Sequence, residues 1–483
     1  MIKKLLIYIS IFIGLLTILL IFNTLRYSSK QEPTEAQPIP PASENNISHF
    51  QEAIKFKTVS FEDSTKYDSV PFFNFHKFLE TTYPLIHQKL KREVISKLSL
   101  LYEWEGKNPN LAPIILLAHQ DVVPVEEASI DQWSVDPFGG QVKDDFIWGR
   151  GTVDDKINLI SIFEVTEKLL QEGYQPQRSI YLVFGHDEEQ GGNSGAKNIA
   201  SLLQSRNVHA DLVMDEGGFI TTDKVPFLEK PVALLGTSEK GYMSLTLTAN
   251  KTGGHSSMPE PETAISILTR ALDRIHENPF EAEFIGSSQS FLDFVGPEMP
   301  FFQKMLFANQ WLFNRILLNI YEKSASSNAT VRTTSVPTIL KAGMKDNVIP
   351  TMAEATVNFR LLPGNSSSDV IERVKKLIDD DRIKISIAHN FAVEATPKAS
   401  SVDGFGFTKV SQTINKSIGN TFVAPFLMIG GTDSRYFSIL SDNIIKFSPM
   451  IDPIGFHTID ERVSIKSFGM NLWFYEQLIR NLD

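Results

Sequence analysis

"IILLAHQDVVP", residues 114–124, is the stretch that decides the fold class. Ile114 to Ala118 contain no polar side chain, and a short apolar run of this kind is typical of a strand buried on both faces of a parallel sheet. His119 and Asp121 lie just beyond it. Polar side chains at the end of a buried strand need partners, so this strand end is a candidate functional site.

Strand-like and helix-like segments alternate after this stretch. Residues 178–185 and 210–218 have strand patterns, whereas residues 155–174 and 194–206 have apolar residues at helical spacing. Such alternation predicts an α/β fold with a mixed, mostly parallel sheet flanked by helices. Functional residues then gather beyond the carboxyl ends of the strands.

The pattern changes near Glu239. Residues 241–250 alternate like a half-exposed strand, and residues 353–363 resemble a second strand of an antiparallel sheet. The simplest interpretation is an α+β lid domain inserted into a larger catalytic domain. The predicted boundaries are catalytic residues 49–238 and 391–483, lid residues 239–390, and a Phe-rich insertion at about 280–330.

The N-terminal segment predicts a membrane anchor. Leu5 to Phe22 are eighteen residues without a charge, which is at the lower limit for a transmembrane helix. We assign residues 1–30 to a single-pass signal anchor and residues 31–48, rich in Pro, Ser, Gln and Glu, to a disordered linker. The catalytic domain is then extracytoplasmic: periplasmic, extracellular or lumenal. A cleaved signal or lipoprotein-like peptide is the alternative.

The length, charge and cysteine content of the chain limit the kinds of protein and of functional site that it can be. At 483 residues the chain is too long for one ordinary hydrophobic core, so two or three domains are expected. A net charge of −11 argues against a nucleic-acid partner. The chain has no cysteine, which excludes disulfides, thiolate metal sites and a cysteine nucleophile.

Histidine and carboxylate side chains concentrate in a few short segments. Alone, each segment is more often a capping histidine or a solvated acidic loop than a set of metal ligands. Together they follow apolar runs, where carboxylates are costly unless a cation pairs with them. Histidine nitrogen and carboxylate oxygen without sulfur suit catalytic zinc, and also manganese or cobalt. The segments contain His119 and Asp121, Asp154 and Asp155, His186 to Glu189, Asp215 and Glu216, and His457.

Eight motifs in order resemble one known family. They are "HQDVVP", "GRGTVDDK", "GHDEEQGGNSGAK", "DEGG", "GGHSSMP", "NVIP", "GGTDSRYF" and "HTIDERV". This set resembles the co-catalytic di-zinc aminoacylase and carboxypeptidase family (peptidase family M-twenty), with its zinc exopeptidase-like catalytic domain. The Phe-rich insertion and residues 328–350 look most like the branch of carboxypeptidase S and the N-fatty-acyl-amino-acid hydrolases/synthases.

The resemblance implies two zinc ions per subunit. It assigns His119 and Asp215 to the first ion, Glu189 and His457 to the second, and Asp154 to both. It also implies a zinc-bridging water.

The resemblance implies three further features at this centre. Glu188 is the general base for the bridging water. Asp121 accepts the second ring N–H of His119; residues i and i+2 of a strand share one side. The peptide bond between Asp154 and Asp155 is cis.

Further residues are implied to bind the substrate. His255 of the lid stabilises the oxyanion. Asn347 and Arg360 hold the substrate carboxylate or oxyanion, for which the planar fork of arginine is suited. A catalytic-domain loop faces the substrate through Gly430, Gly431, Thr432 and Arg435.

The predicted reaction is hydrolysis of an amide bond next to a free carboxylate, which releases an amino acid. The substrate is a small peptide or an N-acyl amino acid, and the same site can run synthesis. The Phe-rich insertion favours an acyl pocket or a membrane-facing surface, with plain lid core as the alternative. A catalytically inactive, membrane-tethered binding module on the same fold is the alternative function. In family dimers the lid can supply its histidine to the partner, and the sequence leaves the oligomeric state open.

Overall fold

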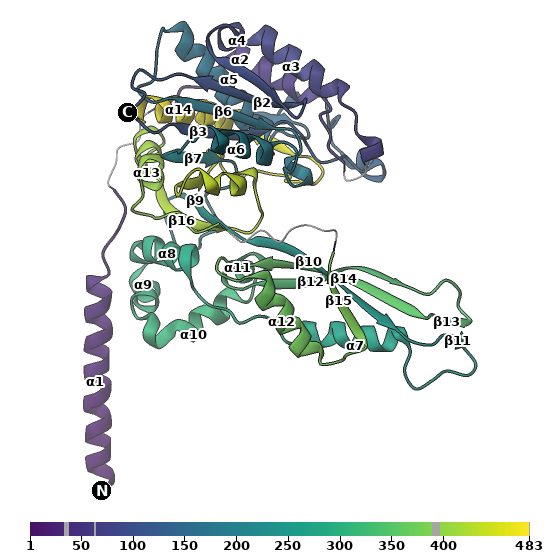
Figure 1. The fold of residues 1–483 in the computed structure, drawn as a ribbon. Helices are drawn as coiled ribbons and strands as arrows, with labels where there is room; N and C mark the ends of the chain where they lie inside the picture. The colour runs from purple at the N-terminus through teal and green to yellow at the C-terminus, as the bar shows by residue number, and fades with distance from the viewer. Residues whose placement is uncertain (33–37, 62–63, 389–396, 483) are drawn as a thin grey trace.

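The main sheet lies in the upper part of the molecule as drawn in Figure 1, among helices. The computed structural model describes residues 1–483 apart from 33–37, 62–63, 389–396 and 483. Within the described residues this sheet has nine strands, and β8 (Ile220–Thr221) pairs with β9. The other strands lie in the order β1 (Lys91–Ile95), β2 (Ser99–Trp104), β6 (Ile180–Gly185), β3 (Ile114–His119), β7 (Leu212–Asp215), β17 (Ile444–Lys446), β9 (Val232–Glu239) and β16 (Phe422–Met428).

The strand directions confirm the predicted fold class. Strand β3 runs parallel to both β6 and β7, and β7 runs parallel to β17. Strands β9 and β16 are also parallel, whereas β1, β2 and β6 pair antiparallel at one edge. The sheet is therefore mixed and mostly parallel, and the carboxyl ends of β3, β6 and β7 lie together.

Helices cover both faces of the sheet, so β3 is buried on both sides. Ile114 and Leu116 belong to the core with α5 (Lys156–Gln171) and α14 (Ile465–Asn481). Ile115 and Leu117 belong to a second core with α6 (Ala196–Ser205) and η5 (Asp433–Ile439). The period of two along a strand explains this division. Helices on the α5 side include α2 (Glu44–Lys55), α3 (Val70–Thr82) and α4 (Pro84–Lys89).

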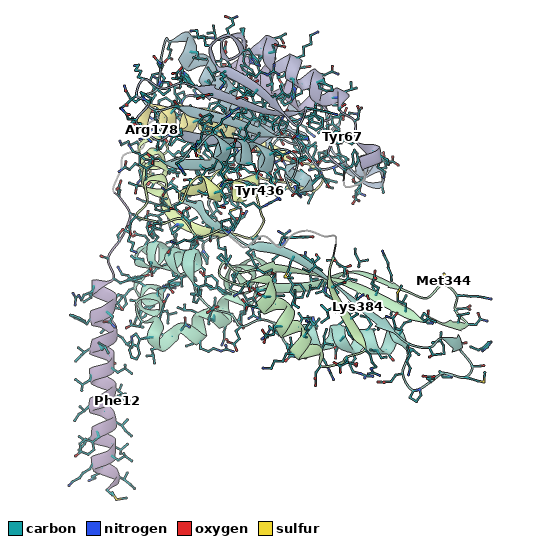
Figure 2. All side chains as sticks on the ribbon, in the orientation of Figure 1. Phe12, Tyr67, Arg178, Met344, Lys384 and Tyr436 are labelled. Carbon is teal, nitrogen blue, oxygen red and sulfur yellow. The ribbon has the colours of Figure 1, made fainter. Side chains whose placement is uncertain are left out.

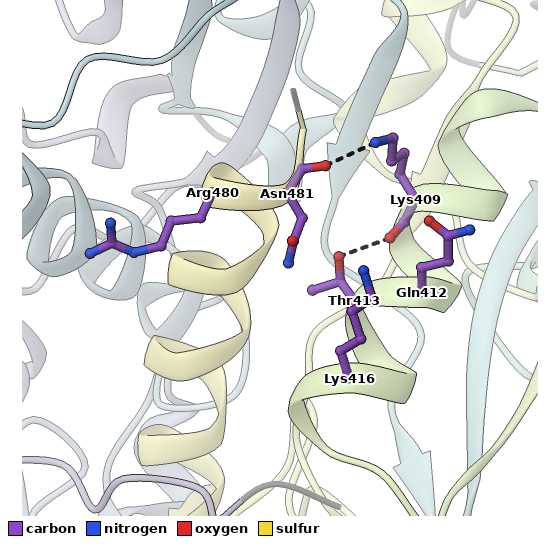
Figure 3. A pocket seen from close by; sticks show the side chains of 6 residues that line it. All are labelled: Lys409, Gln412, Thr413, Lys416, Arg480 and Asn481. Carbon is purple, nitrogen blue, oxygen red and sulfur yellow. Dashed lines mark hydrogen bonds between the residues drawn. The ribbon is translucent and has the colours of Figure 1, made fainter. Parts of the chain in front are cut away.

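Helix α13 (Phe405–Ser417) packs beside α14. Lys409 of α13 donates to the backbone carbonyl of Asn481 at the end of α14, at 2.9 Å (Figure 3). A cationic side chain stabilises the negative end of a helix. The pocket of 220 Å³ between the two helices is lined by none of the predicted site residues, and Lys409 in its wall caps the end of α14.

A second sheet lies beside the main one. Its strands follow the order β12 (Thr334–Ala342), β14 (Met352–Leu361), β10 (Gly241–Asn250) and β15 (Ile383–Ile387), all antiparallel. Its core includes residues of α7 (Ala264–Glu277) and α12 (Ser367–Ile378). We call residues 241–388 the inserted region. The pattern change predicted near Glu239 falls at the passage from β9 to β10; the domain boundaries themselves stay a prediction.

Two short sheets complete the described strands. Strand β11 (Gly254–His255) pairs with β13 (Val348–Ile349) at the end of the inserted region farthest from α1 (Figure 1). Strands β18 (Arg462–Ser464), β5 (Phe146–Trp148) and β4 (Gln141–Lys143) form a small antiparallel sheet.

The Phe-rich segment forms four α-helices and a short 3-10 helix: α8 (Gly286–Val295), η4 (Gly296–Glu298), α9 (Phe301–Ala308), α10 (Gln310–Tyr321) and α11 (Ala325–Val331). Its phenylalanines do not gather in one place. Phe294 is buried in the core of the main sheet, and Phe280 packs against the core of the second sheet. Phe301 and Phe302 are exposed.

Helix α1 (Ile2–Arg26) projects from the body of the molecule (Figures 1 and 2). It is long and apolar enough to cross a membrane, with a mean hydropathy of 2.9. After this helix, Gln31 is hydrogen-bonded to β16. Its side chain donates to the carbonyl of Val423 at 3.0 Å and accepts the N–H of the same residue at 2.8 Å. Helix α2 begins at Glu44, inside residues 31–48, for which the sequence predicted a disordered linker.

Candidate metal centre and active site

The carboxyl ends of three parallel strands position the candidate site. His119 ends β3, and Asp215 ends β7 with Glu216 directly after it. Strand β6 ends at Gly185, and the chain then forms the short helix η3 (Glu188–Gln190). These parallel strands end at one edge, so side chains from distant sequence positions meet there.

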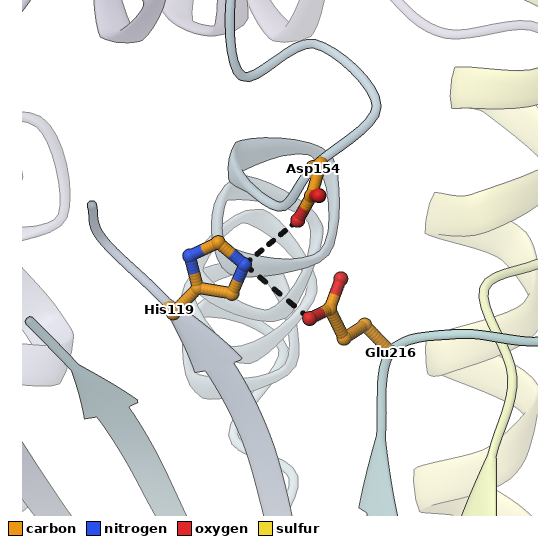
Figure 4. Close-up of side chains that lie close together, drawn as sticks. All are labelled: His119, Asp154 and Glu216. Carbon is orange, nitrogen blue, oxygen red and sulfur yellow. Dashed lines mark hydrogen bonds and ion pairs between the residues drawn. The ribbon is translucent and has the colours of Figure 1, made fainter. Parts of the chain in front are cut away.

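The first group of side chains centres on His119 (Figure 4). Its ring Nε2 lies 2.8 Å from Asp154 Oδ1 and 3.3 Å from Glu216 Oε1. His119 is fully buried, with 1% of its surface exposed. The three ligand atoms lie within 4.8 Å of one another.

The second group shares Asp154 with the first. Asp154 Oδ2 lies 2.8 Å from Nε2 of His457, and that same nitrogen lies 3.2 Å from Oε2 of Glu189. Again the ligand atoms lie within 4.8 Å of one another. Each oxygen of Asp154 therefore faces a different histidine, an arrangement that suits a bridging carboxylate.

Glu216, and not Asp215, stands beside His119. The sequence had assigned this position to Asp215, but Asp215 Oδ2 accepts the backbone N–H of Ser434 at 2.8 Å, and Oδ1 accepts that of Glu216 at 2.9 Å. Adjacent residues of a strand point to opposite faces. Asp215 shares the side of Val213, which packs against η5, and so turns away from the two groups. Both residues carry a carboxylate, so residue type does not tell which of them is the ligand. Only the alternation of side chains along β7 shows which one faces His119.

Asp121 acts on both the histidine and the η3 helix. The Nδ1–H of His119 donates to the backbone carbonyl of Asp121 at 2.9 Å. The carboxylate, which the sequence predicted as acceptor, lies farther away, with Oδ1 at 3.5 Å. That carboxylate accepts the backbone N–H groups of Glu188 and Glu189, both at 3.1 Å, and the hydroxyl of Ser60 at 2.7 Å. It thus fixes the start of η3.

The carboxylates of the site repel one another in a buried place. Burial raises the pKa of Glu216 well above its usual range, and the charge of Asp154 raises it further. Burial also raises the pKa of Glu188, against the opposing effect of His119. The pKa of Glu189 is raised by burial and by Asp154. Such a concentration of negative charge calls for bound cations.

The donor set fits two divalent metal ions. It offers imidazole nitrogen, carboxylate oxygen and one shared carboxylate, as catalytic metal sites do. The hydrogen bond at Nδ1 leaves Nε2 of His119 as the coordinating nitrogen. Oε1 of Glu189 is buried and has no hydrogen-bond partner among the described residues.

The loop that carries Asp154 is held by Glu461, which sequence reasoning missed. This buried carboxylate accepts the backbone N–H groups of Gly151 and Val153, at 3.0 and 2.8 Å, and pairs with Arg150. It lies in the "HTIDERV" motif, four residues after His457, so the motif was the available signal. The peptide bond between Asp154 and Asp155 is cis, as predicted.

The loop before and within η5 adjoins the site. Thr432 donates through its backbone N–H to Glu239 at 3.2 Å. Arg435 donates to the carbonyls of Thr432 and Gly191, and Gly191 directly follows η3. Beside Gly430 there is open space, whereas a Cβ on Gly431 would meet Arg435. This loop therefore borders the helix that carries Glu188.

The predicted residues of the inserted region are not brought to the two groups. His255 is exposed in β11, and its Nδ1 accepts the backbone N–H of Ser257 at 3.1 Å. Asn347 stands beside it, with its carbonyl accepting the N–H of Ser256 at 3.2 Å. Arg360 lies on β14, its guanidinium over the ring of Tyr242 at 4.7 Å. Their roles stay predictions.

The fold and the paired histidine–carboxylate groups define a class of metal-dependent peptidases and amidohydrolases. The family model described as "Peptidase family M20/M25/M40" matches residues 115–481. The chain belongs to this family and is an enzyme of that class, as predicted.

Two relatives place it within the family, and a solved structure shares its fold. It is 40% identical to "Probable carboxypeptidase S-like 2" of Dictyostelium discoideum, over 98% of this chain and 93% of the relative. It is 39% identical to "N-fatty-acyl-amino acid synthase/hydrolase PM20D1" of Xenopus tropicalis, over 89% and 84%. The metallo-carboxypeptidase Sso-CP2 of Sulfolobus solfataricus shares the fold, with a TM-score of 0.67, 16% identity and coverage of 91% and 99%. The predicted branch is confirmed.

Proposed function

We propose that this protein is a membrane-anchored di-zinc amidohydrolase that cleaves an amide bond next to a free carboxylate and releases an amino acid. One observation carries the proposal. Asp154 presents one oxygen to His119 and the other to His457, with Glu188 in the adjoining helix. A shared carboxylate with a separate acid nearby is what a two-metal hydrolase requires.

His119 and Glu216 would hold one ion, Glu189 and His457 the other, and Asp154 both. When bound, the ions supply Lewis acidity and lower the pKa of a water molecule between them. The ligands suit zinc, and cobalt and manganese are substitutes that the same ligands accept.

Glu188 is assigned the proton transfer. Its backbone is fixed by Asp121, and its carboxylate lies close enough to His119, Glu216 and Glu189 for their charges to act on it. In our proposal Glu188 takes a proton from the attacking water and passes it to the leaving nitrogen. Burial, which raises its pKa, suits a group that must accept a proton and then donate it.

The substrate carboxylate would be met by arginine. Arg435 borders η3, and its charge is among the causes that lower the pKa of Arg360, so the two guanidinium groups are near each other. Burial lowers the pKa of Arg360 from its usual value, and the charge of Arg435 lowers it further, so an anion between the two is stabilised. Arginine forks bind carboxylates through both oxygens.

We favour an N-acyl amino acid with a long acyl chain over a short peptide. The relative from Xenopus tropicalis is named for N-fatty-acyl amino acids. Helix α9 also packs on the apolar helix α1, and α9 and α10 both expose apolar side chains. Hydrolysis rates for dipeptides and for N-acyl amino acids of rising chain length distinguish the two. Faster turnover of dipeptides than of every long-chain substrate would overturn this choice.

Membrane attachment is part of the proposal, with α1 as a single span and the catalytic region extracytoplasmic. The C-terminal end of α1 and the residues after it bond to the body: Asn23 to Asn309, Tyr27 to Leu292 and Gln31 to Val423. Such contacts support a retained anchor over a cleaved signal peptide.

Glu188→Gln tests the catalytic assignment. The amide cannot act as a base, so kcat is expected to fall by about 10²–10⁴-fold while the metal content stays at that of the wild type. The control is Glu126→Gln, at an exposed glutamate. A wild-type protein that binds metal and substrate but hydrolyses no amide would instead support the inactive binding module.

A further inference from the structure

Asn309 attaches the corner between α9 and α10 to the apolar part of α1. Its Nδ2 donates to the backbone carbonyl of Leu20 at 3.2 Å, and its Oδ1 accepts from Asn23 Nδ2 at 2.9 Å. Asn309 is fully buried by these contacts. Leu20 lies within the uncharged segment Leu5–Phe22, so the corner stands level with the last apolar turn of that segment.

Helix α10 exposes an apolar stripe. Leu312, Ile316 and Ile320 are four residues apart, so they share one side of the helix. Leu317 and Leu318 are buried instead, on the side that faces the protein. Trp311 of α10 and two phenylalanines at the start of α9 are exposed as well, and we call the whole set the α9–α10 apolar face: Phe301, Phe302, Trp311, Leu312, Ile316 and Ile320.

Helix α10 is oriented relative to α1 as a helix lying in the membrane interface is oriented relative to a transmembrane helix. Helix α9 packs on α1, and α10 runs across the direction of α1 at the side of the molecule from which α1 projects (Figure 1). Trp311 is 61% exposed at the start of the stripe, and Arg315 is exposed within it. Tryptophan and cationic side chains beside an apolar stripe are typical of helices that lie in the headgroup region.

We propose that the α9–α10 apolar face is embedded in the lipid headgroup and acyl boundary of the membrane that α1 spans. The protein then has two membrane attachments: a transmembrane helix and an interfacial helix pair fixed to it by Asn309. This fixes the height and the tilt of the main sheet above the bilayer. The inference rests on the membrane span of the proposed function and is independent of the catalytic assignment.

Spin labelling of the full chain tests the proposal directly, because the chain has no cysteine and single cysteines are unique labelling sites. The labelled variants are Ile316→Cys in the face, Phe12→Cys in α1 and Phe73→Cys in α3. Ile316 and Phe73 are matched in exposure, at 49% and 50%, and α3 lies at the opposite end of the molecule (Figure 1). Each is placed in nanodiscs of phosphatidylcholine and phosphatidylglycerol, and its accessibility to oxygen and to a water-soluble nickel chelate is measured.

The label at position 316 is expected to show a higher oxygen-to-nickel accessibility ratio than the label at 73, shifted towards the ratio at 12. If the accessibility ratio of the label at position 316 equals that at position 73 while the label at position 12 is lipid-exposed, the membrane span is supported and the interfacial position of the α9–α10 apolar face is refuted. If 12 is also water-exposed, the membrane span of the proposed function fails too. Dipolar broadening between identical 316 labels would show a second copy on this face and overturn the lipid assignment. Ile320→Cys, in the same stripe, repeats the measurement if Ile316→Cys does not fold.

Discussion

The backbone N–H of Glu188 donates to the buried carboxylate of Asp121 across 3.1 Å, although the two residues are far apart in the sequence. The same carboxylate accepts the N–H of Glu189, and the carbonyl of Asp121 accepts from the ring of His119. One residue thus sets the positions of the assigned base and of a ligand in each histidine–carboxylate group.

Asp121→Asn is expected to lower metal affinity or kcat/KM by about 10–100-fold, because an amide keeps one acceptor oxygen and turns its NH₂ towards a backbone N–H. Metal titration and steady-state kinetics measure both effects. The control is Ser60→Ala, which removes only the hydroxyl bond to the same carboxylate. Equal losses in the two variants would contradict the positioning role.

Glu216→Gln and Asp215→Asn are expected to differ in kind. The first removes a carboxylate beside His119 and should weaken the binding of one ion, measured by metal content after dialysis. The second disturbs acceptors of two backbone N–H groups and should lower the melting temperature with the metal content retained. The reverse pattern would restore the assignment made from the sequence.

Removal of metal is expected to abolish amide hydrolysis and to lower the melting temperature. The chelated protein retains clustered carboxylates whose charges repel, and ligands that bind the folded state stabilise it by mass action. Zinc, cobalt or manganese should restore both properties. Full activity after complete chelation, verified by elemental analysis, would rule out the metal mechanism.

Lys240 predicts a pH-dependent stability. It lies between β9 and β10, and burial lowers its pKa from 10.5 to about 7, with the charge of Arg360 contributing. The unfolded chain therefore binds this proton at pH values where the folded chain has lost it. Raising the pH from 7 to 9 should stabilise the wild type relative to Lys240→Met, by at most about 1.4 kcal/mol per pH unit. Thermal unfolding at both pH values measures the difference, with Lys55→Met at an exposed lysine as the control.

His255 predicts complementation between chains. It is exposed at the outer end of the inserted region and is not among the groups around Asp154. If it acts on the site of a second copy, co-expression of His255→Ala with Glu188→Gln should recover part of the activity that each variant lacks alone. We expect recovery; none at all would indicate that the inserted region closes on its own chain.

The sequence predicted the fold, and it predicted that histidine and carboxylate segments would follow buried strands, for a common physical reason. Runs such as Ile114 to Ala118 are too apolar for anything but a buried strand, and parallel strands bring their ends together. Asp215 and Glu216 could not be distinguished, because the choice depends on which face of β7 meets η5. The Phe-rich segment was equally ambiguous, because composition does not tell where each side chain points. In the structure Phe294 is in the core, whereas Phe302 is exposed.

The amide of Gln31 gives and takes hydrogen bonds at Val423 as a neighbouring strand would. Strand β16 is at the edge of the main sheet, and exposed edges invite pairing with other chains. Gln31 therefore covers part of this edge, at Val423. Removal of residues 1–31 would leave the N–H and carbonyl of Val423 without these partners, and we expect the shortened protein to self-associate more than the full chain.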